Sequence, residues 1–320
     1  MINYFSDLQR KLVLRNGRYT FYKFILPTFK NYLLFLFLIF LNCSPNHYYF
    51  STIQGFDTET NHKIRNFLLE TKNYPNRKVA TFDGDGTVLG QAPHYMADEC
   101  LYEVARDNPT KKPDVIKKMT KLSNVSMEYV QLRVKFFEGD SVDYLRELGA
   151  SCYKKYYAGK VYKPMVDLIK LLKENRFEVW IITASPEAMY QKFLSEELQI
   201  PITNIVGIKS VVRGGIITGT MVEPIAQDHG KKEAIETFVQ AQPLLVGGNS
   251  RGDKEMIEYS KNLKLIINPD EHVAEDQTES IAEYARKNNW LIAKIKDVPS
   301  QDFPYISSKT FNIKKNKTNE

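Results

Sequence analysis

Along most of this chain, segments with a helical spacing of hydrophobic residues alternate with short, continuous hydrophobic runs. Segments with apolar residues three and four positions apart, such as 164–175 and 186–198, predict helices. Continuous apolar runs separate them, as in FEVWIIT at 177–183 and PLLVGG at 243–248. Runs without polar alternation are typical of parallel strands, because helices cover both faces of such a sheet. The pattern therefore predicts an α/β fold with a doubly wound, Rossmann-like, mostly parallel sheet.

The expected elements continue on both sides of this region. A helix is expected to begin near Asp57 or Thr58, where a capping residue precedes an apolar stripe, and the first strand covers 78–82. The later elements alternate: a strand near 204–212 with a small hairpin around Gly214 and Gly215, a helix over 231–240, the strand at 243–248, a helix over 253–260 and a strand over 263–269. This order again favours parallel strands joined by helices.

Residues 91–163 interrupt the alternation with helical spacings and many charges, which predicts a helical insertion. We therefore expect a core domain made of 77–90 and 164–300, with a helical domain over 91–163 inserted after the first strand. Residues 44–76 are expected to form a linker and an N-terminal helix. The tail at 301–320 is rich in lysine and asparagine and is expected to be flexible.

The formal charge of +6 is concentrated at the two ends of the 320-residue chain. Residues 1–42 carry six Lys or Arg against one Asp, and the segment from Lys309 carries four Lys against one Glu. The rest of the chain is therefore slightly acidic. It lacks the excess of basic residues that binding to nucleic acid requires, so no nucleic-acid partner is expected.

An apolar run, YLLFLFLIFL at 32–41, follows the basic N-terminal stretch. It is shorter than the about 20 residues of a membrane-spanning helix, but it matches the hydrophobic region of a signal peptide. Cys43 follows closely and resembles the lipidated cysteine of a bacterial lipoprotein, although Asn42 stands where such signals have a small residue. We expect 1–43 to be a lipoprotein signal, with an uncleaved anchor as the alternative. Both place the body outside the cytoplasm, attached to a membrane.

The other two cysteines are Cys100 and Cys152. In an oxidising compartment they would pair with each other, and otherwise they are two buried free thiols. The spacing of cysteines and histidines does not resemble a zinc site.

Two aspartates follow the first strand directly, in TFDGDGT at 81–87. Asp83 and Asp85 lie so close in sequence that their carboxylates should repel each other, and they are costly to desolvate. A metal ion, or a reaction that needs two acids in different protonation states, would explain them. Ligands of a doubly wound sheet lie beyond the carboxyl ends of its strands. The same edge should hold Thr183, the loop before Lys231 and the segment GGNSRGD at 247–253.

Four segments resemble, in their order, the motifs of haloacid dehalogenase-like phosphatases: DGDGT at 83–87, VWIITAS at 179–185, a lysine that opens a helix at 231, and GNSRGD at 248–253. The resemblance covers about 78–269. It implies that Asp83 is the nucleophile that forms an aspartyl-phosphate and that Asp85 is the general acid and base. It implies a phosphatase rather than a dehalogenase, because the dehalogenase branch lacks the second aspartate.

The resemblance also assigns the groups that hold the phosphate. Gly84 lets the backbone approach, so that amide N–H groups contact the phosphate oxygens, and Thr183 offers a hydroxyl. Lys231 supplies a positive charge to the nucleophile and the transferring group, with Lys232 as the alternative. Thr87 is expected to brace the turn.

A magnesium ion is the cofactor that the resemblance implies, held by Asp83, the main-chain carbonyl of Asp85, Asn249 and Asp253. Asn249 departs from the family's pattern, which has Asp at both ends of a D-x-x-x-D spacing. An amide oxygen ligates Mg²⁺ without adding charge, so we expect a weaker site. This departure leaves a second function open, a binding or surface-interaction lipoprotein on a catalytically weakened scaffold.

The insertion resembles the helical cap that closes over the site in the branch with phosphoserine and phosphorylcholine phosphatases. Such a lid favours a small phosphomonoester as substrate. The segment is rich in tyrosine, at 95, 102, 129, 144, 153, 156, 157 and 162. An aromatic box for a quaternary ammonium would favour phosphorylcholine, whereas Asp98 or Glu99 would suit the amine of phosphoserine or phosphoethanolamine. The alternative is that most of these tyrosines serve packing.

Overall fold

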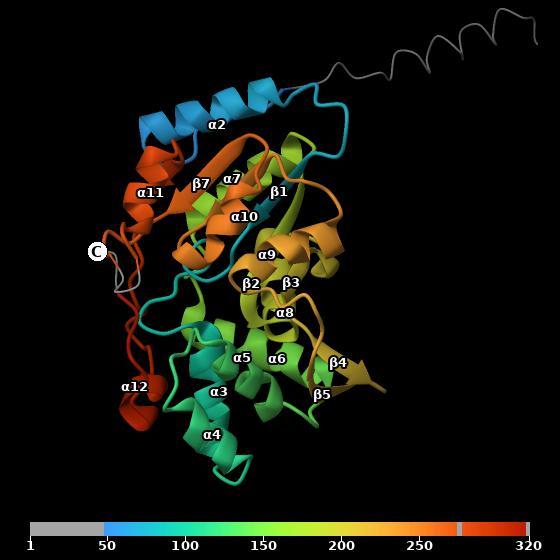
Figure 1. Ribbon diagram of the computed structural model, residues 1–320, viewed down its shortest axis with the longest axis vertical. Coiled ribbons are helices and arrows are strands. Elements are labelled where there is room, and N and C mark those ends of the chain that lie inside the picture. Colours follow the sequence, from blue (N-terminus) through green and yellow to red (C-terminus); the bar gives the residue numbers. More distant parts are fainter. Residues whose placement is uncertain (1–47, 274–276, 318–320) are drawn as a thin grey trace, which may run out of the picture. The chain divides into compact units, whose positions relative to one another are not determined.

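Six parallel strands form the central sheet of the computed structural model, in the order β3–β2–β1–β6–β7–β8 (Figure 1). The structure describes residues 48–273 and 277–317. The strands are β1 (Val79–Phe82), β2 (Glu178–Pro186), β3 (Ile205–Ile208), β6 (Leu245–Gly248), β7 (Leu263–Ile267) and β8 (Leu291–Ala293). The predicted doubly wound parallel sheet is confirmed.

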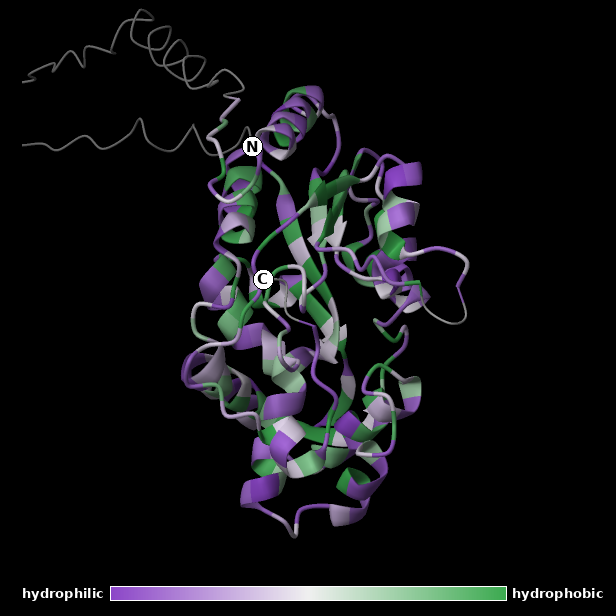
Figure 2. Ribbon diagram, turned by 90° about the vertical axis from the view of Figure 1, so that its left-hand side faces the viewer, coloured by the Kyte–Doolittle hydropathy of each residue, from purple (hydrophilic) through white to green (hydrophobic). Residues whose placement is uncertain are grey.

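Helices cover both faces of this sheet. Alternate strand residues belong to two separate hydrophobic clusters, with Ala80 and Ile181 in one and Val79 and Ile182 in the other. The first cluster is completed by α2 (Thr58–Glu70), α7 (Lys163–Glu174) and α8 (Glu187–Leu198), and the second by α9 (His229–Ala234), α10 (Lys254–Glu258) and α11 (Ile281–Lys287). Figure 2 shows that these helices carry both hydrophobic and hydrophilic residues, as amphipathic helices do.

Local signals explain where individual helices begin. Asp57 is the N-cap of α2, and its side chain accepts a hydrogen bond from Thr60 N at 2.7 Å. Helix α7 begins with Lys163 and Pro164. An N–H group in the first turn has no acceptor within the helix, so the N–H that proline lacks costs no hydrogen bond there. The buried residues of α7 are Met165, Leu168, Ile169, Leu171 and Leu172, which form the apolar stripe read from the sequence.

A group of helices occupies the chain between β1 and α7. It comprises α3 (Met96–Asp107), α4 (Pro113–Met119), α5 (Met127–Phe136), α6 (Val142–Cys152) and a π-helical turn at Tyr153–Tyr157. The hairpin of β4 (Ser210–Arg213) and β5 (Ile216–Met221) joins this group through a bridge between Ser141 and Ile216. We call residues 91–163 the cap. A disulfide between Cys100 and Cys152 links α3 to the end of α6. Of the two alternatives from the sequence, a disulfide or two free thiols, the structure contains the disulfide.

The C-terminal segment packs against the cap, which corrects the expected flexible tail at 301–320 for the part up to 317. Helix α12 (Ile306–Phe311) lies on α3, and the rings of Phe311 and Tyr102 stack with centroids 4.7 Å apart. Glu99 accepts hydrogen bonds from the backbone N–H groups of Ile306 and Ser307. Composition alone hid these contacts, because the few apolar residues of the tail are widely spaced.

The expected lipoprotein signal at 1–43, including Cys43, lies outside the described residues. Within 48–273 and 277–317, every helix is too short or too polar to cross a lipid bilayer.

Candidate active site

Three neighbouring strands bring the sequence motifs together at one edge of the sheet. Phe82 at the end of β1 pairs in register with Ile181 of β2 and with Gly247 of β6. The residues that follow these positions therefore meet beyond the carboxyl ends of the strands. Asp83, Asp85, Thr183, Lys231 and Asn249 all line one cavity of about 470 Å³ there.

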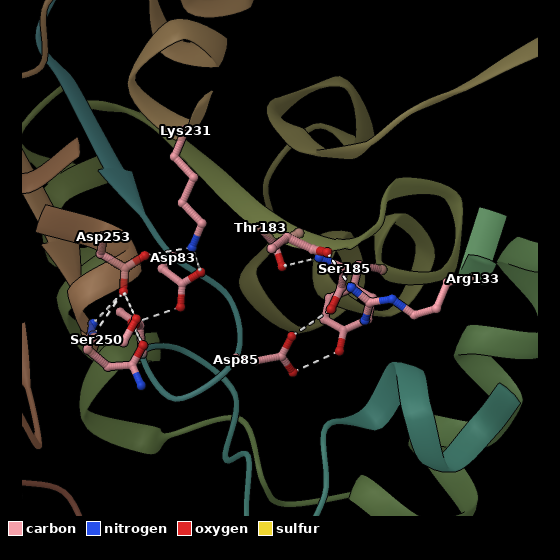
Figure 3. A network of polar contacts seen from close by, with 12 residues as sticks. Asp83, Asp85, Arg133, Thr183, Ser185, Lys231, Ser250 and Asp253 are labelled. Carbon is pink, nitrogen blue, oxygen red and sulfur yellow. Dashed lines mark hydrogen bonds and ion pairs between the residues drawn. The ribbon is translucent and has the colours of Figure 1, made fainter. Parts of the chain in front are cut away.

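Lys231 lies between two carboxylates (Figure 3). Its Nζ is 2.6 Å from Asp83 Oδ1 and 2.6 Å from Asp253 Oδ1, and all three residues are buried. Burial alone would lower the pKa of Lys231, but the charges of Asp253 and Asp83 outweigh burial and raise it. The ammonium group therefore stays charged. Lys232, the alternative from the sequence, forms an exposed ion pair with Glu236, which lies in the π-helical turn after α9.

Asp83 has both carboxylate oxygens engaged. Oδ1 accepts a hydrogen bond from Lys231 Nζ, and Oδ2 accepts one from Thr87 Oγ1 at 3.1 Å. Thr87 therefore braces the turn. Burial and the negative charge of Asp253 raise the pKa of Asp83 to about 7, although Lys231 opposes them. A further cation beside this carboxylate would favour its ionised, nucleophilic form.

Asp253 has a different environment from the one expected of a metal ligand. Its Oδ1 binds Lys231, and its Oδ2 accepts three hydrogen bonds, from Asn249 N, Ser250 N and Ser250 Oγ, each at 3.0 Å. Three donors saturate Oδ2, and Asp253 does not line the cavity, so only the second acceptor site of Oδ1 is open to a further ligand. The geometry gives Asp253 the task of holding Lys231 and closing the loop 249–253.

The remaining oxygen groups fit a magnesium ion. The Asn249 side chain lies directly over Gly86, where a Cβ would be only 2.0 Å from Nδ2, and its Oδ1 is 3.5 Å from Thr87 Oγ1. Asp83, the Asp85 carbonyl and Asn249 are hard oxygen donors with one formal charge, which suit Mg²⁺ when water completes the shell. Within the described part of the chain, no group of three or more His, Cys, Asp or Glu side chains is arranged to hold a metal.

Asp85 is held by two hydroxyl groups. Ser185 Oγ donates to Oδ2 at 2.8 Å and Tyr190 OH donates to Oδ1 at 2.7 Å. Burial raises the pKa of Asp85 to about 6, while the hydrogen bonds from Tyr190 and Ser185 limit the rise. A carboxyl group with this pKa can carry a proton near neutral pH and release it, as an acid–base catalyst must.

The backbone after β1 approaches β2 closely. A Cβ on Gly84 would lie 3.1 Å from Thr183 Oγ1, so glycine allows the chain after β1 to come close to the Thr183 side chain of β2. Thr183 Oγ1 accepts a hydrogen bond from Ser185 N at 3.1 Å and lines the cavity. The expected phosphate-binding positions are therefore adjacent to Asp83.

The cap supplies one wall of the cavity, through residues that the sequence reading missed or misjudged. Arg133 on α5 donates from Nη2 to Ala184 O at 2.9 Å and lies 3.7 Å from Asp98. It lines the cavity together with Gln91, Tyr95 and Asn124. The sequence signal for Arg133 was one charged residue among others on α5, beside Glu128 and Lys135, which no motif marks.

The cap tyrosines mainly serve packing and hydrogen bonding. Of the eight, Tyr95 lines the cavity, while Tyr129 donates to Asp98 and Tyr157 donates to the His94 carbonyl. An aromatic box is therefore not formed at the described cavity. Asp98 and Glu99 do not line it either: Asp98 accepts from Tyr129 and Asn124, and Glu99 binds the start of α12.

Comparisons with known proteins agree with this architecture. The family model of the haloacid dehalogenase-like hydrolases matches residues 80–258. Phosphoserine phosphatase SerB1 of Mycobacterium tuberculosis is 26% identical over 162 residues, which are 49% of this chain and 49% of that protein. The chain thus spans about half the length of the curated relatives it matches.

Two solved structures share the fold. A functionally unknown protein from Anaerococcus prevotii has a TM-score of 0.57 and 15% identity, covering 76% of this chain and 94% of its own. A protein of unknown function from Bordetella pertussis has a TM-score of 0.54 and 14% identity, covering 68% and 98%.

Proposed function

This chain belongs to the haloacid dehalogenase-like hydrolases, and on that premise we propose that it is a phosphomonoesterase that works through an aspartyl-phosphate on Asp83. The observation that carries the proposal is the placement of two carboxyl groups, Asp83 and Asp85, in one cavity with the ammonium group of Lys231 2.6 Å from the first. A nucleophile, a proton donor and a fixed positive charge are the groups that phosphoryl transfer needs.

The chain's own residues account for both halves of the reaction. A carboxylate oxygen of Asp83 attacks phosphorus, the bond to the leaving oxygen breaks, and Asp85 gives its proton to that oxygen. Water then attacks the phosphorus of the aspartyl-phosphate, loses a proton to Asp85 and releases inorganic phosphate with Asp83 restored. Lys231, Thr183 and the backbone at Gly84 stabilise the negative charge of the phosphoryl oxygens.

A magnesium ion completes the proposed site. Asp83, the Asp85 carbonyl and Asn249 are the residues that would hold it, and it would supply further positive charge to the transferring phosphoryl group. Asn249 lowers the charge of this set relative to two carboxylates, so we expect weaker magnesium binding than an aspartate would give.

The cavity favours a small ester whose leaving group carries a carboxylate. Arg133 places a guanidinium group in the wall, with the buried carboxylate of Asp98 3.7 Å from it, while Glu99 binds the start of α12. The guanidinium group can donate hydrogen bonds to a carboxylate of the substrate, whereas a quaternary ammonium has no acceptor to offer it. We therefore favour a phosphoserine-like substrate over phosphorylcholine, which reverses the preference that the tyrosine count suggested.

Turnover of p-nitrophenyl phosphate by the purified protein tests this function. We expect hydrolysis that needs magnesium, stops in Asp83→Asn, and is competed more strongly by phosphoserine than by phosphorylcholine. Hydrolysis that survives Asp83→Asn and chelation of metal would contradict the proposed chemistry. Binding of phosphate esters without turnover in calorimetry would instead support the binding lipoprotein.

We also propose that the protein is attached to a membrane outside the cytoplasm, through a lipid on Cys43 or through an uncleaved anchor. The signal-like segment at 32–41 and the Cys100–Cys152 disulfide support this, because structural disulfides persist in oxidising compartments. Labelling of cells with a fatty-acid analogue should mark the wild-type protein and not Cys43→Ala. Equal labelling of both would contradict lipidation at Cys43.

A further inference from the structure

The side chain of Asp85 is fixed at both ends of its carboxyl group. Ser185 holds Oδ2 at 2.8 Å and Tyr190 holds Oδ1 at 2.7 Å (Figure 3 shows the contact with Ser185). Ser185 belongs to β2, next to the catalytic edge, whereas Tyr190 comes from α8. Two donors on opposite oxygens restrict rotation of the carboxyl plane, so they decide where its proton can be delivered.

Tyr190 also makes contact with the cap. Its hydroxyl accepts a hydrogen bond from Ala97 N at 3.3 Å. Ala97 is the second residue of α3, and N–H groups in the first turn of a helix have no acceptor within the helix. The hydroxyl therefore links the start of α3 to Asp85, accepting from one and donating to the other.

The surroundings hold the Tyr190 ring in place. The side chain is fully buried and packs edge-on against Phe193, with ring centroids 5.4 Å apart. A buried ring with this packing has little rotational freedom. The position of the hydroxyl thus depends on α8 and on the hydrogen bond from α3.

We propose that Tyr190 is a positioning residue for the general acid, through which the placement of α3 over the core orients Asp85 toward the leaving oxygen. The inference rests on the proposed phosphomonoesterase function. Proton donation requires the acid within hydrogen-bond reach of the leaving oxygen. Loss of the Tyr190 hydroxyl would leave Asp85 in the cavity but free to turn away.

Leaving-group dependence separates this role from a purely structural one. The leaving group of an alkyl phosphate is a strongly basic alkoxide, which needs a proton from the general acid. The leaving group of p-nitrophenyl phosphate is p-nitrophenolate, which is stable without that proton. The value of kcat/KM covers steps up to the loss of the leaving group and excludes the later attack by water. A misplaced acid should therefore lower kcat/KM for alkyl esters selectively, while a general loss of folding lowers both alike.

The principal variant is Tyr190→Phe, which keeps the ring and removes the hydroxyl. We expect kcat/KM for an alkyl ester such as O-phosphoserine to fall about 10- to 100-fold, part of the full value of a general acid, and that for p-nitrophenyl phosphate to change less than about threefold. Ser185→Ala should produce the same selective loss. Equal losses for both esters in Tyr190→Phe, or no loss, would overturn the proposal.

Tyr157→Phe is the matched control. Tyr157 is an equally buried tyrosine whose hydroxyl donates to the His94 carbonyl at 2.9 Å. Its loss should leave the ratio of the two kcat/KM values unchanged, and a shift like that of Tyr190→Phe would contradict a specific role for Tyr190.

Ala97→Pro tests the link to α3, since it removes the N–H at a helical position that accepts proline, as Pro164 shows in α7. We expect a selective loss for the alkyl ester, and an unchanged ratio would contradict the link. Activity that persists in Asp83→Asn would reject the proposed function itself, whatever Tyr190→Phe shows.

Discussion

Lys160 and Asp297 form a buried ion pair, with Nζ 2.7 Å from Oδ1, where the chain crosses between the sheet and the cap. Lys160 Nζ also donates to the carbonyl oxygens of Ala92 and Val298 at 2.8 Å each. The second oxygen of Asp297 accepts from the N–H groups of Gln91 and Ala92. The pair thus connects both places where the chain passes between sheet and cap, near 91 and 160, to residues 297 and 298.

Asp297→Ala should strongly destabilise the fold. The change leaves the buried Lys160 ammonium and two backbone N–H groups without their partner, and breaking one side of a buried pair costs about 3–5 kcal/mol. Chemical denaturation followed by circular dichroism measures this loss. The exposed pair of Lys163 and Asp167 in α7 provides the control, because Asp167→Ala should cost about 0.5 kcal/mol or less. Similar losses in the two variants would contradict the role of Asp297.

Reduction of the Cys100–Cys152 disulfide should lower stability while leaving the sheet intact. The bond closes a loop with a sequence separation of 52 residues, and cross-links of that span stabilise by about 2–4 kcal/mol. Urea denaturation with and without a reductant gives the difference. A midpoint that does not move on reduction would show that the bond contributes nothing to stability.

His94 should make the fold sensitive to mild acid. Burial lowers the pKa of His94 to about 4, helped by the nearby Lys315, and its Nε2 contacts Ser308 Oγ at 3.0 Å. The unfolded imidazole binds a proton near pH 6.5, whereas the folded one does so only near pH 4. The free energy of unfolding is therefore highest above about pH 6.5 and decreases as the pH falls toward 4.

The control for this effect is His94→Gln, which does not titrate. Between pH 7 and pH 5 the wild type should lose about 1 kcal/mol more than the variant, a figure reduced for solvent screening. Denaturation curves at the two pH values provide the comparison, and identical pH dependence would refute a buried neutral histidine.

Asn249 and Asp253 should affect magnesium in different ways. Asn249→Asp adds a charge where the metal is expected, so the magnesium concentration for half-maximal activity should fall about tenfold, or ~1.4 kcal/mol. Asp253→Asn weakens the grip on Lys231 and should lower kcat about 10- to 100-fold, with the magnesium constant changed less than about threefold. Magnesium titrations of both variants measure these constants. A large rise in the constant for Asp253→Asn would make Asp253 a metal ligand after all.

The sheet and its catalytic edge could be predicted because they depend on local patterns. Continuous apolar strands must be buried between helices, and parallel strands bring their carboxyl ends together. Asp83, Thr183 and Lys231 meet for that reason. Asp253 was assigned to the metal by its spacing, whereas its hydrogen bonds to Lys231 and to the loop 249–253 depend on side-chain directions that spacing does not give.

The cap and the C-terminal segment were less predictable because they depend on contacts between residues far apart in sequence. Glu99 is bound by residues 306 and 307, and Arg133 of the cap reaches the Ala184 carbonyl across 51 positions. Sequence periodicity contains no information on such pairings. Tyrosine density suggested a ligand box for the same reason, since composition cannot separate a packed ring from one that lines a cavity.

Trapping of the covalent intermediate is the sharpest test of Asp83 as the nucleophile. The protein is mixed with magnesium and a phosphate ester, quenched during turnover and treated with borohydride, which reduces an aspartyl-phosphate to homoserine. Peptide mass spectrometry should then find homoserine at position 83, in amounts that depend on substrate and vanish in Asp83→Asn. Turnover with residue 83 unmodified, or with homoserine at another carboxyl position, would show that Asp83 is not the nucleophile.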